Sequence, residues 1–198
     1  MRHLHCYIIK PYGKRYSNKK YIDDKELILN TSIENHRFVN REGIVIETPI
    51  IGEKYLEKGD KVIVHHNVFR RFYDMKGKEK NSTSFFKEDL YFCYYDQIFL
   101  YNRNNKWDAP QGYCFVNPIK NKDKYNIDKE KPLSGVLKYL SPEVRDFGLK
   151  ENDIIGFTPN SEYEFIIDNK RLYRVPTNSI SIKYGHKKDE TEYNPEWL

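Results

Sequence analysis

The sequence has little of what membrane proteins and disulfide-stabilised secreted proteins depend on. Its 198 residues include a single alanine, Ala109, and three cysteines, Cys6, Cys93 and Cys114. An odd number of widely spaced cysteines gives no disulfide framework and is typical of a reducing compartment. No apolar run is long enough to cross a bilayer, and the N-terminus has no signal-type apolar core. These absences predict a cytoplasmic protein without a membrane partner.

The motifs of common enzyme classes are also absent. The chain has no glycine-rich phosphate cradle and no Gly-x-Ser-x-Gly nucleophile elbow. Its paired acids, Asp23-Asp24, Glu88-Asp89 and Asp189-Glu190, fall in expected loops or in the tail rather than converging at strand ends. We therefore expect no catalytic residues and no cofactor, and the chain is not expected to be an enzyme.

His65-His66 is the one pair that suggests a metal, with Cys6 and Cys93 as possible neighbours in space. However, no ligand pair has the spacing of a structural zinc motif. Adjacent residues of a strand also point to opposite faces of the sheet. We therefore expect no metal site.

Aromatic side chains and dispersed charge are what the chain does contain. Seventeen tyrosines and eleven phenylalanines offset a mean hydropathy of -0.84, because each ring buries a large area in a small core. The net charge of +5 is spread over both halves. The most basic aromatic stretch, Phe69–Tyr73 followed by three lysines, is interrupted by acids, so it favours a solvated hairpin over a single-strand nucleic-acid platform.

A repeated pattern is the most informative feature of the sequence. Two stretches, 43–101 and 135–183, read as short strands around an apolar strand that follows a charged turn. Each stretch is preceded by an apolar strand that ends in proline, Tyr7–Pro11 in one case and Cys114–Pro118 in the other. A duplicated small β-unit favours assembly and binding over a single catalytic cleft.

The periodicity predicts an all-β protein with no long helix. Strands are expected at 5–11, 43–46, 61–66, 90–94, 97–101, 113–117, 135–140, 153–158, 162–167, 171–175 and 179–183. Asp168-Asn169 is a hairpin signal, and Ser141 with Pro142 can begin one short helical turn. The segment 74–84 is expected to be an exposed loop. The expected organisation is a first domain at 1–104, a second at 105–184 and a polar tail at 185–198.

At this point the residues resemble the GroES-type co-chaperonin family. That family combines a Gly-led strand, a Gly-Asp turn before an apolar strand, a hairpin and a final strand. The matching residues are Gly135-Val136-Leu137, Lys150–Phe157, Glu164–Asp168, Leu172–Val175 and Ser179-Ile180 in the second unit, and Gly43-Ile44-Val45, Lys58–Val64, Leu90-Tyr91-Phe92 and Asp96-Gln97-Ile98 in the first. The resemblance implies two tandem small GroES-like β-barrels.

The family also docks on its chaperonin ring through an apolar tripeptide carried by a long flexible loop. The first unit has a long connection at 12–42, in which Leu27, Ile28 and Leu29 stand where the tripeptide would. The alternative is that these three residues form an ordinary strand of the first barrel. The second unit has only a short polar connection at 121–131, so the resemblance assigns docking to the first unit alone.

The resemblance implies a co-chaperonin that caps a host GroEL-type chaperonin and assembles into a ring or pseudo-ring. The short connection at 48–54 is similar to that of bacteriophage co-chaperonins, and the abundance of Lys, Asn, Ile and Tyr, which is typical of an AT-rich genome, would suit a phage gene. Neighbouring subunits would pair through edge strands that contain Tyr7, Ile8, Ile9, Ile98, Leu100, Ile180 and Ile182. Two alternatives remain open: a phage virion or scaffold protein that reuses the barrel for assembly, and a β-barrel that binds nucleic acid through Arg70 and Arg71.

Overall fold

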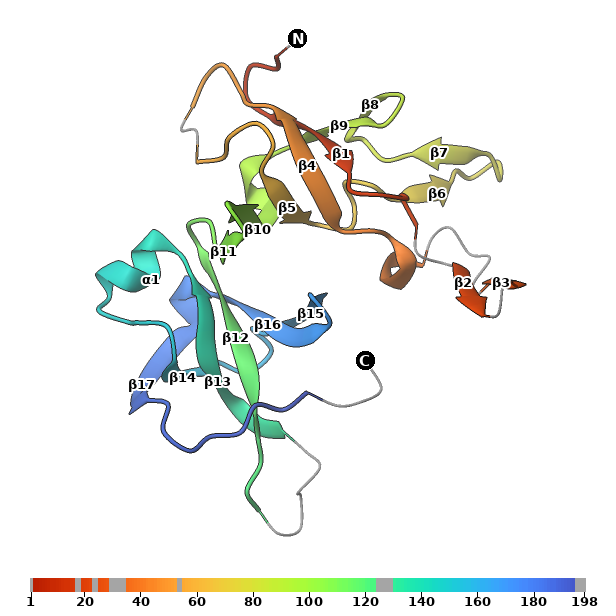
Figure 1. The fold of residues 1–198 in the computed structure, drawn as a ribbon. Helices are drawn as coiled ribbons and strands as arrows, with labels where there is room; N and C mark the ends of the chain where they lie inside the picture. Colours follow the sequence, from red (N-terminus) through yellow and green to blue (C-terminus); the bar gives the residue numbers. More distant parts are fainter. Residues whose placement is uncertain are drawn as a thin grey trace. The chain divides into compact units, whose positions relative to one another are not determined.

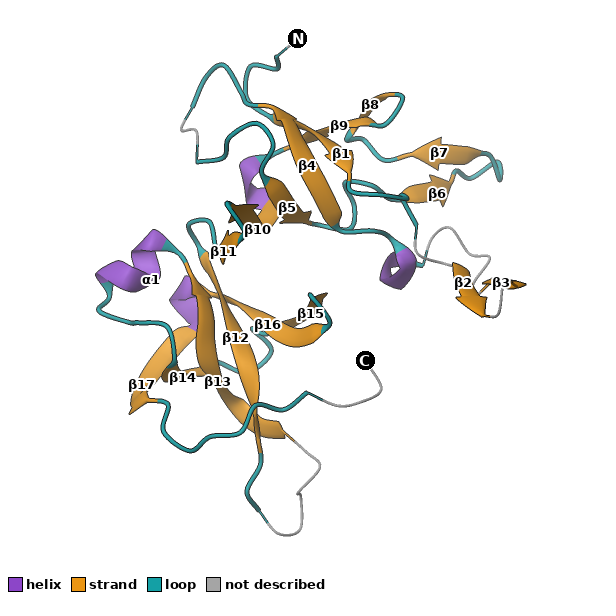
Figure 2. Cartoon of the chain, viewed as in Figure 1, coloured by secondary structure: helices purple, strands orange, loops and turns teal. Residues whose placement is uncertain are grey.

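A computed structural model describes residues 2–16, 19–22, 25–28, 35–52, 55–123 and 130–194. The chain divides into two compact units, Met1–Lys106 and Trp107–Leu198, and each is built mainly from β-strands (Figures 1 and 2). The expected all-β class is therefore confirmed. None of the helical segments in the described ranges has the length and apolar character of a membrane span.

The first unit is organised around an open seven-stranded sheet with the order β11-β10-β5-β4-β1-β9-β8. Its strands are β1 (Tyr7–Pro11), β4 (Glu42–Glu47), β5 (Lys61–Val64), β8 (Phe85–Lys87), β9 (Leu90–Cys93) and β10 (Ile98–Arg103), and the sheet continues beyond β10 with β11 (Lys106–Asp108), which begins at the last residue of this unit. Two further hairpins, β2 (Lys19–Ile22) with β3 (Lys25–Ile28) and β6 (Arg71–Tyr73) with β7 (Glu79–Asn81), form separate two-stranded sheets.

The second unit contains an open six-stranded sheet with the order β15-β16-β12-β13-β14-β17. Its strands are β12 (Tyr113–Lys120), β13 (Glu130–Leu140), β14 (Asp153–Phe157), β15 (Tyr163–Ile167), β16 (Lys170–Pro176) and β17 (Ile180–His186). The short helix α1 (Pro142–Asp146) begins at the Ser141 cap, as the sequence predicts. Neither large sheet closes on itself through the strand pairs of the described residues, so the expected barrel closure is not observed.

The two sheets share one strand order and one register. The order β10-β5-β4-β1-β9-β8 in the first unit corresponds to β17-β14-β13-β12-β16-β15 in the second. The cross-strand row Pro11, Gly43, Val62 of the first unit has its counterpart in Pro118, Gly135, Ile155 of the second. The sequence repeat is therefore also a repeat of three-dimensional structure.

The turn before β5 and β14 is built in the same way in both units. Gly59 and Asn152 both have left-handed backbones, with φ of 96° and 69°, which Gly and Asn adopt more readily than most residues. The Gly59 N–H donates to the Val45 carbonyl at 2.8 Å, and the Asn152 N–H donates to the Leu137 carbonyl at 2.9 Å. The aspartate that follows each of them, Asp60 or Asp153, starts the next strand in a buried position.

Each unit has its own apolar core, and aromatic residues fill a large part of it. The first core is formed mainly by side chains of β1, β4, β5 and β9 with the segment after β5, including Tyr7, Phe69 and Tyr91. The second is formed by β12, β13, β14 and β16 together with Val144 of α1. Phe69 meets Tyr91 edge-on with ring centroids 4.9 Å apart, a favourable aromatic geometry.

Two segments are more ordered than the sequence predicts. The prediction of an exposed loop at 74–84 is wrong, because β7 lies within this segment and pairs with β6. The polar segment after β17 is joined to the second unit: Ile119 bridges to Glu192, and the Tyr193 N–H donates to the Pro118 carbonyl at 2.8 Å. Neither segment has an apolar period, so the sequence gives no sign of this pairing.

The glycine shared by the cross-strand rows leads to a stability test. A Cβ at Gly135 would meet the Val116 side chain at 2.6 Å, whereas a Cβ at Gly43 would meet its nearest atoms at 3.2 Å. Gly135→Ala is expected to lower the free energy of unfolding by about 1–3 kcal/mol, because the packed strand must shift. Gly43→Ala is the matched control and should cost less. Urea unfolding of both variants measures the difference, and an equal or reversed ranking would contradict this packing argument.

Candidate docking site

The candidate docking segment is a hairpin rather than an unpaired loop. β2 and β3 lie between β1 and β4 in the sequence, and they pair with Lys20 opposite Leu27 and Lys19 opposite Ile28. They are not part of the seven-stranded sheet, so the alternative in which Leu27 and Ile28 belong to the main sheet is not observed. Leu29 and the side-chain positions of Leu27 and Ile28 lie outside what the structure describes.

The N-terminal root of this hairpin is held by Arg15 and Tyr16. The Arg15 guanidinium donates to the carbonyls of Phe69 and Arg70 and, at 2.6 Å, to Oδ1 of Asn81. The Tyr16 hydroxyl accepts the Arg71 N–H at 2.6 Å. Both residues therefore connect the start of the docking segment to the base of the β6–β7 hairpin.

The C-terminal root is held by Asn40. Its side-chain amide donates to the carbonyls of Tyr12 and Lys14, both at 2.9 Å, and its Oδ1 accepts the Glu42 N–H at 2.9 Å. Its backbone N–H donates to the Arg15 carbonyl at 3.0 Å. The residues just before and just after the candidate docking segment are thus held next to each other. The segment therefore leaves the first unit and re-enters it at the same place.

The strands expected to pair between subunits differ in how open their edges are. Tyr7, Ile8 and Ile9 lie in β1, which pairs with β4 on one side and β9 on the other. β1 is therefore an interior strand with no free edge, which corrects the expectation for it. Ile98 and Leu100 lie in β10, which is also an interior strand between β5 and β11.

β17, which contains Ile180 and Ile182, is an edge strand in the described part of the second unit. Ile182 is 49% exposed and Tyr184 is 58% exposed. In the first unit the equivalent strand is β10, and its outer edge is paired with β11. An exposed apolar edge strand with unpaired backbone groups is a site for strand addition.

A buried aspartate anchors β10 in the first unit and the equivalent strand β17 in the second. Asp60 pairs with Arg103 at 2.7 Å, and Asp153 pairs with Lys183 at 2.7 Å and with Nδ1 of His186 at 3.2 Å. Burial alone would raise the pKa of Asp153. The hydrogen bonds from Lys183, the Lys150 backbone and His186 outweigh burial, so the pKa lies below its usual value.

The basic aromatic stretch does not form a stacking platform. Phe69 is fully buried in the core, and the Arg71 guanidinium lies 4.9 Å from the Tyr16 ring centroid and pairs with Glu79 at 2.7 Å. Tyr73 is the exposed ring of this stretch, 49% accessible. Successive exposed faces, which single-strand binding requires, are therefore not present here.

Three of the six histidines lie together, and two of them are stacked. His65 and His66 are stacked with centroids 4.3 Å apart, and His36 lies 5.1 Å from His66. Burial, followed by the neighbouring charges of His65, Arg41 and His36, lowers the pKa of His66 to about 4. Within the described ranges, no group of three or more His, Cys, Asp or Glu side chains is arranged to hold a metal ion.

All three cysteines are free thiols inside the protein. Cys6, Cys93 and Cys114 are buried and unpaired with one another. Burial raises the pKa of each thiol, to about 12 for Cys114. Cys6 lies beside His3, with Sγ 3.9 Å from Nε2.

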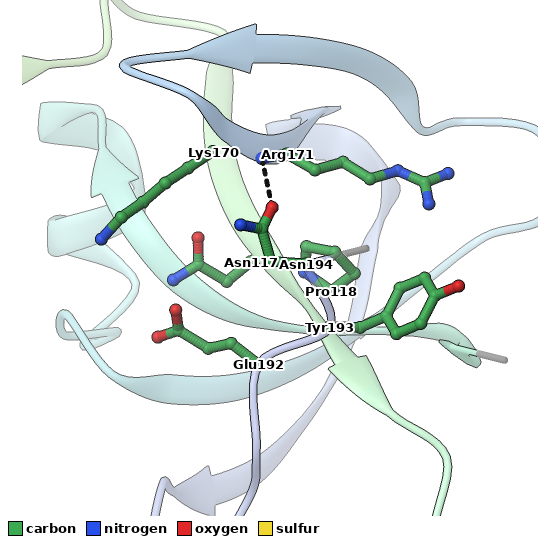
Figure 3. Close-up of a pocket in the computed structure, with 7 residues that line it drawn as sticks. All are labelled: Asn117, Pro118, Lys170, Arg171, Glu192, Tyr193 and Asn194. Atoms are coloured by element: carbon green, nitrogen blue, oxygen red, sulfur yellow. Dashed lines mark hydrogen bonds between the residues drawn. The ribbon is translucent and has the colours of Figure 1, made fainter. Parts of the chain in front are cut away.

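A small pocket lies where the C-terminal segment crosses the second unit (Figure 3). The side chains of Lys170, Asn117 and Glu192 extend to one side of it, whereas Arg171 and Tyr193 extend to the other. The Asn194 side chain accepts the Arg171 N–H at 3.2 Å and holds the segment in place. A cavity volume of about 50 Å³ is far below that of a typical ligand pocket.

Comparison with known proteins gives no match, either to a protein-family model or to a curated protein. The chemistry of this chain must therefore be argued from its own geometry. The sequence indicated the docking segment and the β17 edge, but it did not indicate the roles of Arg15, Tyr16 and Asn40. A charged or polar residue flanking a loop carries no signal of a long-range contact.

The acid sensitivity of the second unit tests the role of Asp153. Its folded pKa is lowered, so its ion pairs stabilise the fold above about pH 4, the unfolded pKa, and this stabilisation is lost as the pH falls through the folded value. Asp153→Asn is expected to lower the free energy of unfolding at pH 7 by about 1–3 kcal/mol and to flatten its decline in acid. Urea midpoints between pH 7 and pH 3 measure both effects. Asp189→Asn, an exposed site, is the control, and an equally steep acid decline in Asp153→Asn would rule out this role.

Proposed function

We propose that this chain is a tandem co-chaperonin of the GroES type, which caps a GroEL-type chaperonin ring and assists ATP-dependent folding. The observation that carries the proposal is an asymmetry within a repeat. Two units share strand order and register, yet among the described residues only the first carries a hairpin, β2–β3, between its first two strands, where the resemblance places a docking arm. In the second unit the corresponding strands are joined by the shorter connection 121–129. The GroES-like assignment of each unit is part of the same proposal.

The hairpin is suited to reversible binding. Burial of Leu27, Ile28 and Leu29 on a partner would contribute about 1.5–3 kcal/mol for each side chain. A strand that is already paired loses less conformational entropy on docking than an unpaired arm does, because part of its backbone is fixed beforehand. The main-chain groups of an edge strand also allow it to add to a groove on the partner.

Several weak arms on one assembly give tight and switchable capping. When the first arm binds, the others are held at high effective concentration, so the avidity exceeds the affinity of any single arm. Release then requires only that the partner weaken each contact slightly. ATP hydrolysis belongs to the ring in this scheme, and the chain contributes only binding.

The open edge of β17 supplies a route to self-assembly. Ile180 and Ile182 would meet a neighbouring strand, and pairing would also cover the unpaired backbone groups. The same edge favours a second candidate, a virion or scaffold protein that uses the repeat for assembly alone. Stable incorporation into purified particles without chaperonin binding would support that second candidate.

Binding to a ring tests the proposed function directly. The wild-type chain is expected to bind a bacterial GroEL-type chaperonin when nucleotide is present. Leu27→Asp/Leu29→Asp should weaken this binding by more than about 100-fold, because two buried leucines are lost. Pull-down with and without ATP, followed by titration, gives the affinities.

The matched control is Ile50→Asp/Ile51→Asp, which changes two apolar residues that are 49% and 53% exposed in the connection between β4 and β5. This control should bind the ring as the wild type does. The proposal is abandoned if the wild type shows no nucleotide-dependent binding, or if both double variants bind equally well.

A further inference from the structure

The β6–β7 hairpin is the second element that distinguishes the first unit from the second. It lies between β5 and β8, whereas the equivalent strands β14 and β15 are joined by the short connection 158–162. The first unit therefore carries two hairpins outside its main sheet, β2–β3 and β6–β7. This hairpin adds little to the core, because the residues of β6 and β7 are exposed or only partly buried.

The tip of this hairpin is a turn closed by several hydrogen bonds. Oδ1 of Asp74 accepts the N–H groups of Lys76 and Lys78, both at 2.9 Å. The Asp74 N–H donates to the Lys78 carbonyl at 2.9 Å, and Gly77 has the φ of 72° that closes the turn. Such a turn is pre-organised, so docking would order little additional chain.

The tip also exposes apolar surface. Met75 is fully exposed and Tyr73 is 49% exposed. An unbranched thioether adapts to irregular pockets, and methionine is used repeatedly at protein-binding surfaces for this reason. A fully exposed methionine is thus presented to solvent at the end of a hydrogen-bonded turn.

Positive charge surrounds this apolar tip. Lys76, Lys78 and Lys80 are exposed, and no ion pair joins them to the described residues. The acids nearby are already engaged, Asp74 by the turn and Glu79 by Arg71 at 2.7 Å. The hairpin therefore offers three exposed ammonium groups, with no ion pair to the described residues, beside one methionine and one tyrosine, and the Asp74 carboxylate within the turn offsets part of their charge.

The two hairpins share a root. Arg15, which precedes β2, donates to the backbone of Phe69 and Arg70 just before β6 and to the side chain of Asn81 in β7. Tyr16 accepts the Arg71 N–H of β6. A partner bound by one hairpin is consequently held close to the other, which raises the effective concentration of the second contact.

We infer that the segment Tyr73–Lys80 is a second docking arm, which binds an acidic protein surface with an apolar pocket for Met75. The inference rests on the proposed function, because the surface is taken to lie on the same chaperonin ring that β2–β3 binds. A protein partner is favoured over nucleic acid, since the segment has only one exposed ring and no run of stacking faces. It is favoured over a lipid surface, since the tip has a single aliphatic side chain.

Charge reversal at the tip is the test. Lys76→Glu/Lys78→Glu/Lys80→Glu should weaken ring binding by at least about tenfold at physiological salt, and the difference should shrink as salt rises. Met75→Ser should weaken binding several-fold at every salt concentration, because it removes apolar contact instead of charge. The measurement is a titration of the full chain onto a GroEL-type ring with nucleotide, after thermal unfolding shows that each variant is folded.

The matched control carries the same charge change elsewhere. Lys106→Glu/Lys122→Glu/Lys188→Glu alters three exposed lysines outside both hairpins and should bind within about twofold of the wild type. If the control variant binds the ring as weakly as the tip variant does, ring binding depends on the net charge of the chain and not on the hairpin tip. That result would overturn the inference.

The outcomes separate this inference from the function on which it rests. If the wild type does not bind the ring, both are overturned. If the ring binds the wild type and Leu27→Asp/Leu29→Asp fails to bind, but the tip variants bind normally, only the second arm is overturned. A further outcome is that the chain binds single-stranded nucleic acid through these lysines while the tip variants bind the ring normally. That outcome would assign the tip to nucleic acid and would also overturn the second docking arm.

Discussion

The buried aspartate at the start of β5 and of β14 is the interaction on which each unit depends. Its side chain joins the turn before the strand to basic residues on another strand, Arg103 of β10 in the first unit and Lys183 and His186 of β17 in the second. Oδ2 of each aspartate also accepts a backbone N–H of its own turn, from Glu57 or Lys150. A carboxylate buried without these donors would be costly, so its burial depends on both the turn and the strand that supplies the basic residue.

Around this common frame the two units have diverged at their connections. The strands, the close backbone approach at Gly43 and Gly135, and the aspartate turn are kept. The connections between β1 and β4 and between β5 and β8 carry hairpins in the first unit, and the edge of β17 is left open in the second. The frame specifies the fold, and the proposed function places binding in the connections that the frame does not need, in keeping with the way loops acquire function on rigid scaffolds.

The sequence predicted the main strands well because alternation and turn chemistry are local. The Asp168-Asn169 turn, with both residues at positive φ, and the Ser141 cap of α1 follow directly from residue type. The interior position of β1 and the β6–β7 pairing were not predictable in this way. Strand order depends on which distant partner pairs, and the charged residues of β7 give no apolar period. For the candidate site, the apolar triplet was visible in the sequence, whereas the root contacts of Arg15 join residues more than fifty positions apart.

The three thiols have a practical consequence. Because Cys6, Cys93 and Cys114 are enclosed and their pKa values are raised, little thiolate is available at neutral pH, and alkylating reagents should react with them slowly. A cysteine introduced on the surface would therefore be modified selectively without removal of the native ones. A fluorophore or spin label can therefore be attached to a cysteine introduced in either hairpin, and the motion of that hairpin can be followed.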